Sequence, residues 1–410
     1  MNKLKHILLF IAAALVSCVP DTDMPNSAKQ DIQIFVSLPE KVLSLASGEL
    51  VVTDINMMSV STFNNAVLLD DSTATITLSL PTGYYNLRFS ASVTNKDNNT
   101  YDIRAYGNRQ SIHSAQTITV NAYATERADK DFVIAEIFFA GTRTPQGKQY
   151  NGDKYFVIAN TSNTVRYADG LILMESKFKN SKAFTVTPDI MASDMAVDAL
   201  YQIPGNGTQY PIQPGGTLLI VDNAIDHRNA NSNSFDLSNA DFEWYDQSSS
   251  ATVTDVDNPD VPNLNKIYCY TLTIWIPNNQ GNTSFALGRL PDNLSPSEYL
   301  SRYRYDYTYI NVTQAGVFEQ SGSCYRFPNS WITDAVNLCP HSTHEWTVVH
   351  ESMDAGWAYV AETGSDNNRY GYSVRRKHSV VNGIRTFQDT NNSTEDFLHK
   401  QVADPTFFRQ

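Results

Sequence analysis

Three histidines lie close together near the C-terminal end of the chain. His341 and His344 are followed by Glu345, and His350 comes a few residues later. Imidazole and carboxylate groups are the usual protein ligands of zinc. The order of these residues is not His-Glu-x-x-His, which excludes the helical arrangement of zinc proteases. Because the cluster follows Pro340, we favour a solvated polar loop beside Trp346 over a metal site.

A second group of residues has the chemistry of a calcium ligand. Asp255, Asp257 and Asp260 form an Asp-x-Asp-x-x-Asp segment. Calcium prefers carboxylate and other oxygen ligands. The segment has no glycine where a helix-loop-helix calcium loop needs one. The sequence therefore allows a structural calcium ion at these three residues, and it predicts no other cofactor and no catalytic residue.

Four tyrosines alternate with polar residues and could form an aromatic platform. Tyr303, Tyr305, Tyr307 and Tyr309 occupy every second position, which places them on one face of a strand. Such a row suits stacking on a sugar, a flat ligand or a partner protein. The alternative, which we favour, is that the row lines the core. Trp244 lies in a polar segment and is a second candidate for recognition, although packing on the domain explains it equally well.

The N-terminal segment and its cysteine predict the location of the protein. Lys3 and Lys5 precede an apolar run that ends at Leu15-Val16-Ser17-Cys18. This run is too short for a membrane span and is typical of a secretory signal. A cysteine directly after the cleavage position is the mark of a bacterial lipoprotein, so we predict that residues 1–17 are removed and that Cys18 is acylated. Cys324 and Cys339 could then form a disulfide in an oxidising compartment.

The charge of the chain limits its partners. The formal net charge is -13, which argues against binding to nucleic acid or anionic lipid by charge. Acyl chains at Cys18 would hold such a protein to the membrane. Asp21 and Asp23 follow Cys18 closely and resemble, as a loose match, the surface-export signal of Bacteroidota lipoproteins. We therefore expect a lipid-anchored protein of the outer membrane, displayed on the cell surface.

The elements that would position these residues are short strands with frequent turns. Ile32, Ile34 and Val36 alternate with polar residues, and Pro81-Thr82-Gly83 separates two similar runs. Apolar strand-like runs continue from residue 132, and no sustained helical periodicity or fixed repeat is present. We predict an all-β protein. Its parts are a tether at 18–30, an N-terminal sandwich at 31–126 and a second sandwich at 127–410, with a loop-rich insertion at about 176–266.

Several segments resemble known families. Leu80-Pro-Thr-Gly-Tyr-Tyr-Asn-Leu-Arg-Phe89 resembles the closing hairpin of small prealbumin-like or immunoglobulin-like sandwiches. The series Tyr155-Phe-Val-Ile-Ala-Asn160, Ile212-Gln-Pro-Gly-Gly-Thr-Leu-Leu-Ile220 and Phe285-Ala-Leu-Gly-Arg289 resembles the lamin-tail domain, an immunoglobulin-like sandwich. The phrase Asp389-Thr-Asn-Asn-Ser-Thr-Glu-Asp-Phe397 resembles the end of bacterial members. The whole chain is similar to an uncharacterised family of Bacteroidota lipoproteins built on this fold.

The resemblance implies a function but transfers no catalytic residue. Members of that lipoprotein family are typically encoded near TonB-dependent receptors of the outer membrane. We therefore expect a non-enzymatic accessory protein that binds a ligand or assists such a receptor. One alternative is a surface adhesin or structural lipoprotein that contacts glycans or proteins. Another, which we favour least, is a hydrolase whose site is assembled from distant loops.

Overall fold

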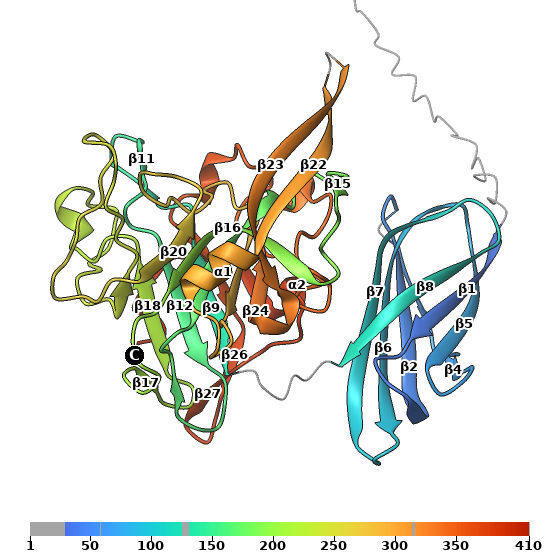
Figure 1. Cartoon of the computed structure of the whole chain (residues 1–410). Helices are drawn as coiled ribbons and strands as arrows, with labels where there is room; N and C mark the ends of the chain where they lie inside the picture. Colours follow the sequence, from blue (N-terminus) through green and yellow to red (C-terminus); the bar gives the residue numbers. More distant parts are fainter. Residues whose placement is uncertain (1–28, 58, 125–130, 314–315, 410) are drawn as a thin grey trace, which may run out of the picture. The chain divides into compact units, whose positions relative to one another are not determined.

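The computed structural model describes residues 29–57, 59–124, 131–313 and 316–409. The predicted signal peptide and Cys18 lie outside the described residues, as does nearly all of the predicted tether. The chain divides into two compact units, Met1–Tyr123 and Ala124–Gln410. We had placed the boundary a little later, between residues 126 and 127. The regular structure of both units is mostly β-strand (Figure 1).

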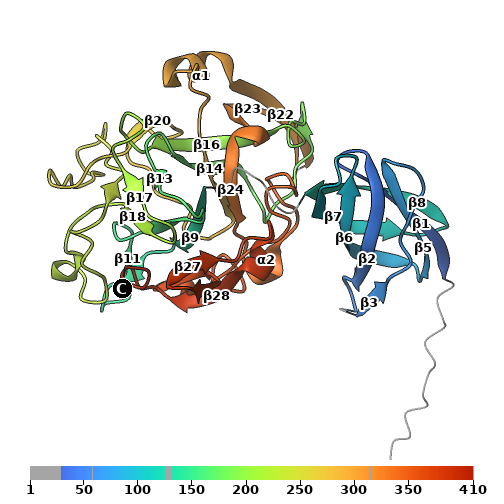
Figure 2. The same ribbon diagram turned by 90° about the horizontal axis from the view of Figure 1, so that it is seen from below.

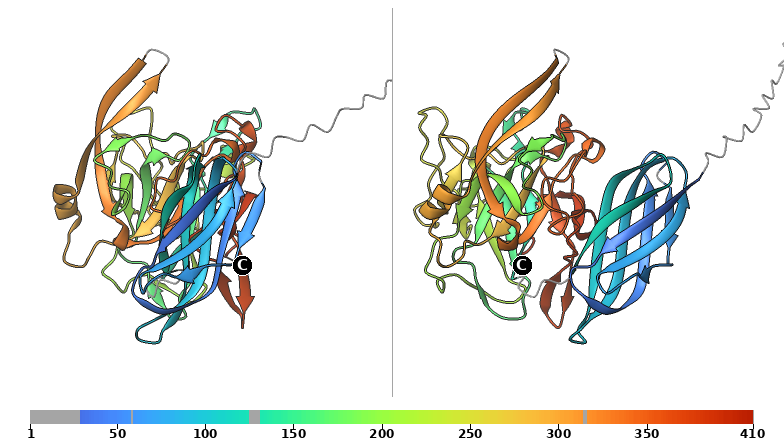
Figure 3. Two further views of the ribbon diagram at one scale, coloured as in Figure 1. Left: turned by 90° about the vertical axis from the view of Figure 1, so that its right-hand side faces the viewer. Right: turned by 45° about the vertical axis from the view of Figure 1, so that its right-hand side comes forward.

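The first unit is built from one curled sheet (Figure 3, right). Its strand order is β3-β2-β6-β7-β8-β1-β5-β4. The strands have the following bounds: β1 (Gln30–Ser37), β2 (Val42–Asp54), β3 (Val60–Phe63), β4 (Val67–Leu68), β5 (Thr73–Leu80), β6 (Gly83–Asn95), β7 (Thr100–Ile112) and β8 (Gln116–Ala124).

Alternation of apolar and polar residues gives this sheet one buried face. Ile34 of β1 lies opposite Ile76 in an antiparallel pair and opposite Ile118 in a parallel pair. All three side chains belong to a single core cluster. Because successive residues of a strand point to opposite faces, the polar residues between them face solvent.

The second unit contains a six-stranded sheet with the order β19-β18-β12-β9-β25-β28. Its strands β9, β12 and β18 are almost continuously apolar and buried, as expected for strands that are covered on both faces. The bounds are β9 (Phe132–Phe138), β12 (Tyr155–Asn160), β18 (Thr217–Val221), β19 (Phe242–Glu243), β25 (Tyr372–Arg376) and β28 (Phe397–Val402).

The second sheet of this unit has the order β15-β22-β23-β16-β14-β21-β24, and β20 pairs with β16. The bounds are β14 (Ile172–Lys179), β15 (Val186–Thr187), β16 (Asp194–Gln202), β20 (Asn265–Cys269), β21 (Thr283–Gly288), β22 (Arg304–Thr313), β23 (Gly316–Pro328) and β24 (Ile332–Asn337). Three small antiparallel pairs complete the strands: β10 (Thr142–Arg143) with β11 (Gln149–Tyr150), β13 (Arg166–Tyr167) with β17 (Pro211–Ile212), and β26 (His378–Val381) with β27 (Ile384–Phe387).

The two large sheets of the second unit pack on each other through one apolar core. Phe156 of β12 and Phe285 of β21 meet with their ring centroids 5.0 Å apart. Figure 2 shows the two layers, with β14 and β16 above β9 and β28. The layers are also joined by a buried carboxylate, since Asp334 of β24 accepts a hydrogen bond from the Ile134 amide of β9 at 2.7 Å.

Strands β22 and β23 form a ribbon that stands out from the second unit (Figure 3, orange). Pairing of β22 with β23 runs from Arg304↔Tyr325 to Thr313↔Gly316. The neighbouring strand β16 pairs only with the Tyr325–Pro328 part of β23. The outer part of the ribbon therefore has no sheet partner on that side.

Helices are few and short in the described residues. They are α1 (Pro296–Arg302), α2 (Ser393–Asp396) and the 3-10 turns η1 (His227–Asn229), η2 (Asn329–Trp331), η3 (His341–Thr343) and η4 (Asn367–Arg369). Among the described residues, no helix has the length and apolar character needed to cross a membrane.

The segment that we expected to be a loop-rich insertion, 176–266, is in part ordered sheet. It supplies β16, an interior strand of the larger sheet, and β18, which pairs with β12. Most of the Asn, Asp and Ser residues of this segment lie in the connections between its strands.

Candidate functional site

A cavity of about 410 Å³ lies beside the base of the β22–β23 ribbon. We call it the Tyr305 pocket. This volume is within the range of small-molecule sites, roughly 300–1,000 Å³. The side chains around it are mainly aromatic and aliphatic: Phe178, Phe184, Thr185, Val186, Asp189, Ile190, Met191, Ala196, Tyr305, Trp346 and Val348.

Three parts of the chain that are far apart in sequence bring these residues together. The first runs from the end of β14 through β15 to the start of β16, the second is β22, and the third is the loop after η3. Phe178 connects them, because its ring lies 5.1 Å from Tyr307 and 6.1 Å from Trp346. The indole nitrogen of Trp346 donates a hydrogen bond to the Lys179 carbonyl at 2.6 Å, which holds the loop against β14.

The polar groups of the Tyr305 pocket are few and fixed. The Tyr305 hydroxyl donates to the Pro188 carbonyl at 2.5 Å. Asp189 Oδ1 accepts from the Met191 amide at 3.0 Å. Burial raises the pKa of Tyr305 to about 12, so this phenol is neutral at physiological pH. Asp189 is thus the one charged side chain among the lining residues.

Two other depressions are open and mostly polar. One, of about 480 Å³, lies along β22 and β23 and includes Arg304, Asp306 and Ser321. The other, of about 430 Å³, lies in the first unit beside Asp31 and Gln33. Neither offers the apolar enclosure that is typical of small-molecule sites.

The predicted tyrosine row is formed in part. Tyr305 and Tyr307 stack with centroids 5.2 Å apart, and Tyr309 follows at 6.1 Å, so these three share a face. Tyr305 and Tyr307 are buried in a small cluster with Ala196 and Cys324. The core interpretation therefore fits both residues, while Tyr305 also lines the pocket.

Tyr303 does not belong to this row, and its prediction was wrong. It is the C-terminal capping residue of α1, one position before β22 begins. Its ring stacks on Tyr299 at 5.3 Å and meets Trp331 at 5.0 Å. Period-two alternation fails here because the backbone at Tyr303 is still completing a helical turn.

Trp244 is a core residue and not a recognition residue. It is completely buried between the sheets. Its ring lies 5.2 Å from Trp275 and 5.7 Å from Phe156. Trp244 directly follows β19. Its burial could not be predicted from the mainly polar segment in which it lies.

The three aspartates of the expected calcium site are not arranged around a cation. Asp255 Oδ2 accepts from the Asp246 amide at 3.0 Å, and Asp257 Oδ1 accepts from the Asn263 side chain at 2.8 Å. In the described residues, no group of three or more His, Cys, Asp or Glu side chains could hold a metal. The calcium expectation was wrong, because Asp255 and Asp257 hold local turns and the three carboxylates do not converge. Burial raises the pKa of Asp255 to about 7.

The histidines near residue 341 also do not converge. His341 pairs with Glu362 at 3.1 Å, and His350 hydrogen-bonds with Ser352 at 2.9 Å. His344 instead stacks flat on Trp357, with centroids 3.9 Å apart. Burial lowers the pKa of His344 to about 4.

Cys324 and Cys339 are not bonded to each other, so the disulfide prediction was wrong. All three cysteines of the described residues are free. Cys324 lies on β23 opposite Tyr305. Cys339 follows β24, where its sulfur lies 3.8 Å from the Thr343 hydroxyl. The short separation in sequence suggested a bond, but Cys324 lies on β23 and Cys339 lies after β24, in different environments.

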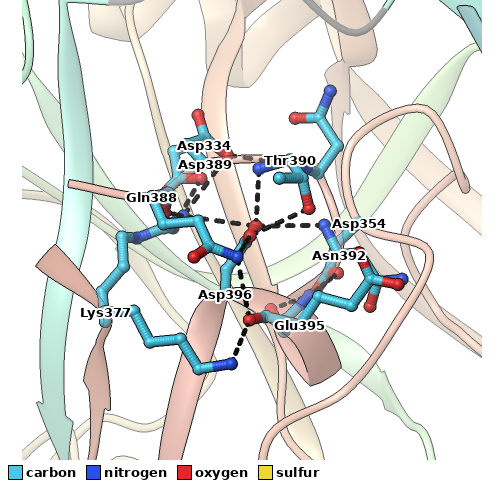
Figure 4. Close-up of polar contacts among 12 residues, drawn as sticks. Asp334, Asp354, Lys377, Gln388, Asp389, Thr390, Asn392, Glu395 and Asp396 are labelled. Atoms are coloured by element: carbon cyan, nitrogen blue, oxygen red, sulfur yellow. Dashed lines mark hydrogen bonds and ion pairs between the residues drawn. The ribbon is translucent and has the colours of Figure 1, made fainter.

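Residues 389–396 form a set of hydrogen-bonded turns (Figure 4). Asp396 accepts from the Thr390 amide at 2.7 Å and from the Thr390 hydroxyl at 2.9 Å. Asp354 accepts from the Ser393 amide at 2.7 Å and its hydroxyl at 2.5 Å. The side chains of this segment therefore cap local turns.

Sequence analysis missed most of the Tyr305 pocket. It did not single out Phe178, Phe184 or Asp189, which lie in the segment that we expected to be a loop. The available signal was the apolar content of Phe184-Thr-Val-Thr-Pro-Asp-Ile-Met191, which is high for a connection. Which distant residues would face this segment could not be read from the chain.

Comparisons with known proteins show a likeness of fold. The chain matches a crystal structure of a DUF4876 family protein from Bacteroides thetaiotaomicron with a TM-score of 0.57 and 18% identity, over 92% of this chain and 97% of that chain. This likeness is one of fold alone. A structure from Parabacteroides distasonis matches with a TM-score of 0.17 and 8% identity, over 74% of this chain and 90% of that chain, and supports no structural conclusion.

Sequence comparison gives two results. No curated protein matches the chain. Residues 213–404, which contain β18 of the smaller sheet and the closing turns at 389–396, match the model of a family described as "Protein of unknown function (DUF4876)".

Proposed function

We propose that this protein is a non-enzymatic binding protein that holds a small, mainly apolar molecule in the Tyr305 pocket. The observation that carries the proposal is the cavity itself. It has a volume of about 410 Å³ and is walled by the rings of Phe178, Phe184, Tyr305 and Trp346. Enclosed aromatic surface with few polar groups is characteristic of ligand sites.

We further propose that the protein works at the outer membrane. Acylation of Cys18 would hold it there, and the lipoprotein resemblance favours display on the cell surface and a TonB-dependent receptor as partner. In this account the Tyr305 pocket captures a ligand that the receptor transports. Affinity purification of the acylated protein from its own outer membrane tests this part. Recovery of such a receptor in near-equal amount supports it, and recovery of the protein alone from membranes with intact receptors contradicts it.

The finer fold assignment is also a proposal. We propose that the second unit is a lamin-tail-like, immunoglobulin-like sandwich and that the first is a prealbumin-like or immunoglobulin-like sandwich. Two facing sheets in the second unit and a single core enclosed by mainly antiparallel strands in the first support these assignments.

A second candidate function is adhesion. The β22–β23 ribbon exposes apolar side chains on one face, with 68% of Val317 and 42% of Ile310 accessible to solvent. Exposed apolar groups that lie together are typical of contact surfaces between proteins. Binding to glycans or proteins without a receptor, lost when both residues are changed to serine, would favour adhesion.

A plugged variant tests the proposed binding site. Thr185 lies in the exposed part of the pocket lining, so Thr185→Trp should fill the cavity without disturbing the core. The probe is N-phenylnaphthylamine, a neutral aromatic dye whose emission rises in apolar surroundings. We expect saturable binding to the full chain, at least tenfold weaker in Thr185→Trp. The control, Ala192→Trp, adds the same side chain at a nearby exposed residue outside the lining. Equal binding by the plugged variant would overturn the proposal.

A further inference from the structure

The lining of the Tyr305 pocket contains one acidic side chain and no basic one, which indicates the charge of the ligand that it would bind. Asp189 is the only acidic or basic side chain of the lining. Its Oδ1 accepts from the Met191 amide at 3.0 Å. A carboxylate on an otherwise apolar wall favours a positive charge on the bound molecule and disfavours a negative one.

The aromatic rings add a second preference for a positive charge. Phe178, Phe184, Tyr305 and Trp346 all border the cavity. The faces of aromatic rings attract cations, and groups of such rings bind quaternary ammonium ions. Phe184 already makes a contact of this kind, because the ammonium of Lys182 lies 4.9 Å from its ring centroid.

Two basic residues near the pocket have partners of their own. Lys182 donates a hydrogen bond to Asn311 Oδ1 at 3.2 Å, and Lys177 pairs with Asp198 at 3.1 Å. Neither residue belongs to the lining. An anionic ligand would therefore meet Asp189 and no lining cation.

We propose that the Tyr305 pocket takes organic cations, meaning molecules with an amine or quaternary ammonium group on an apolar body. The rings would enclose the apolar body and the cationic head, and Asp189 would face the positive charge. This inference rests on the proposed binding function and goes beyond it, since the cavity alone does not require any charge on the ligand.

Three probes of nearly equal shape test the charge preference. Phenylbutyltrimethylammonium is the cation, its carbon isostere is the neutral probe, and phenylpentanoate is the anion. Calorimetric titration of the full chain should give an affinity for the cation at least tenfold higher than for the neutral isostere, and weak or no binding of the anion. A pocket that acts only through apolar contact would prefer the neutral isostere, because it is easier to remove from water.

Two substitutions change the charge in opposite directions. Asp189→Asn should lower the affinity for the cation by about tenfold and leave the neutral probe unchanged. Lys182→Met removes the ammonium that contacts Phe184 and should raise the affinity for the cation two- to threefold. Both are exposed positions, so melting temperatures should stay close to that of the unmodified chain and serve as the folding control.

The outcomes separate this inference from the proposed function. Equal or tighter binding of the neutral isostere, blocked by Thr185→Trp, would overturn the charge preference and keep the binding function. A cation preference that survives Asp189→Asn would overturn the role of Asp189. Failure of Thr185→Trp to block any probe would overturn the Tyr305 pocket as the site, and the charge inference with it.

Discussion

The hydroxyl of Tyr305 donates a hydrogen bond to the carbonyl oxygen of Pro188 at 2.5 Å, across 117 residues of sequence. Tyr305 belongs to β22, and Pro188 follows β15, which pairs with β22 only at Val186↔Tyr309 and Thr187↔Thr308. This bond helps to hold the segment that carries Asp189 and Ile190 against the strand, together with the bond from the Asn329 side chain to the Met191 carbonyl at 3.1 Å. The shape of the Tyr305 pocket depends on this segment.

Tyr305→Phe should loosen the pocket wall. Loss of one intramolecular hydrogen bond costs roughly 0.5–1.5 kcal/mol of unfolding free energy. We expect faster amide hydrogen exchange at residues 186–191 and weaker binding of N-phenylnaphthylamine. Tyr309→Phe is the matched control, because it removes the bond from Tyr309 to Gln320 farther out on the ribbon. Unchanged exchange at 186–191 in Tyr305→Phe would contradict this role.

Arg376→Leu should strongly destabilise the second unit. Arg376 is almost fully buried, donates to both oxygens of Asp334 at 2.8 and 3.0 Å, and lies 3.3 Å from Asp389. Removing one partner of a buried pair leaves uncompensated charge and costs about 3–5 kcal/mol.

Tryptophan fluorescence during urea unfolding measures this loss, because all five tryptophans lie in the second unit. The control is Arg304→Leu, which breaks an exposed pair with Asp306 at 3.0 Å. Exposed pairs contribute about 0–1 kcal/mol. Similar losses in the two variants would show that the buried pair is not a main support of the fold.

Acid should destabilise the protein through His344. Burial lowers its folded-state pKa from 6.5 to about 4. The unfolded chain therefore binds the proton more tightly, and stability is lost as the pH falls from about 6.5 towards 4. At pH 5 the loss from this residue is about 2 kcal/mol.

His344→Phe keeps an aromatic ring on Trp357 and removes the titration. The variant should lose less stability than the unmodified chain between pH 7 and pH 5, by roughly 2 kcal/mol in urea unfolding. The difference between the two proteins at pH 8 provides the baseline. If the stability of the two proteins depended on pH in the same way, His344 would have the same pKa in the folded and unfolded states, which would contradict this prediction.

Reductant should not change the melting temperature. Cys324 and Cys339 are free and buried, and burial raises the pKa of each thiol to about 12. Alkylation by iodoacetamide at pH 8 should be slow in the folded protein and rapid in urea. Peptide mass spectrometry then identifies the sites. Recovery of a peptide that joins Cys324 to Cys339 would contradict the free state.

Strand periodicity predicted much of the fold correctly. The alternation of Ile32, Ile34 and Val36 identifies β1 and its buried face, because every second residue of a strand points to the same side. The apolar runs at 132–138 and 155–160 match β9 and β12. These are local signals, and each can be read without knowledge of the partner strand.

The pocket could not be predicted because it depends on partners distant in sequence. Phe178 and Trp346 approach each other across the fold, although nothing in their local sequence relates them. Trp244 is a similar case, since it is buried by Phe156 and Trp275 and not by its neighbours in the chain. The residue types suggested which side chains could bind a ligand. Burial and the order of the strands determine which of them actually line a cavity.

The most direct test of the central claim is hydrogen exchange of the full chain with and without saturating N-phenylnaphthylamine. The account predicts slower exchange at residues 184–191 and 346–348, which border the Tyr305 pocket, and no change in these segments for Thr185→Trp. Protection that appears elsewhere, or that persists in the plugged variant, would contradict the assignment of this pocket as the binding site.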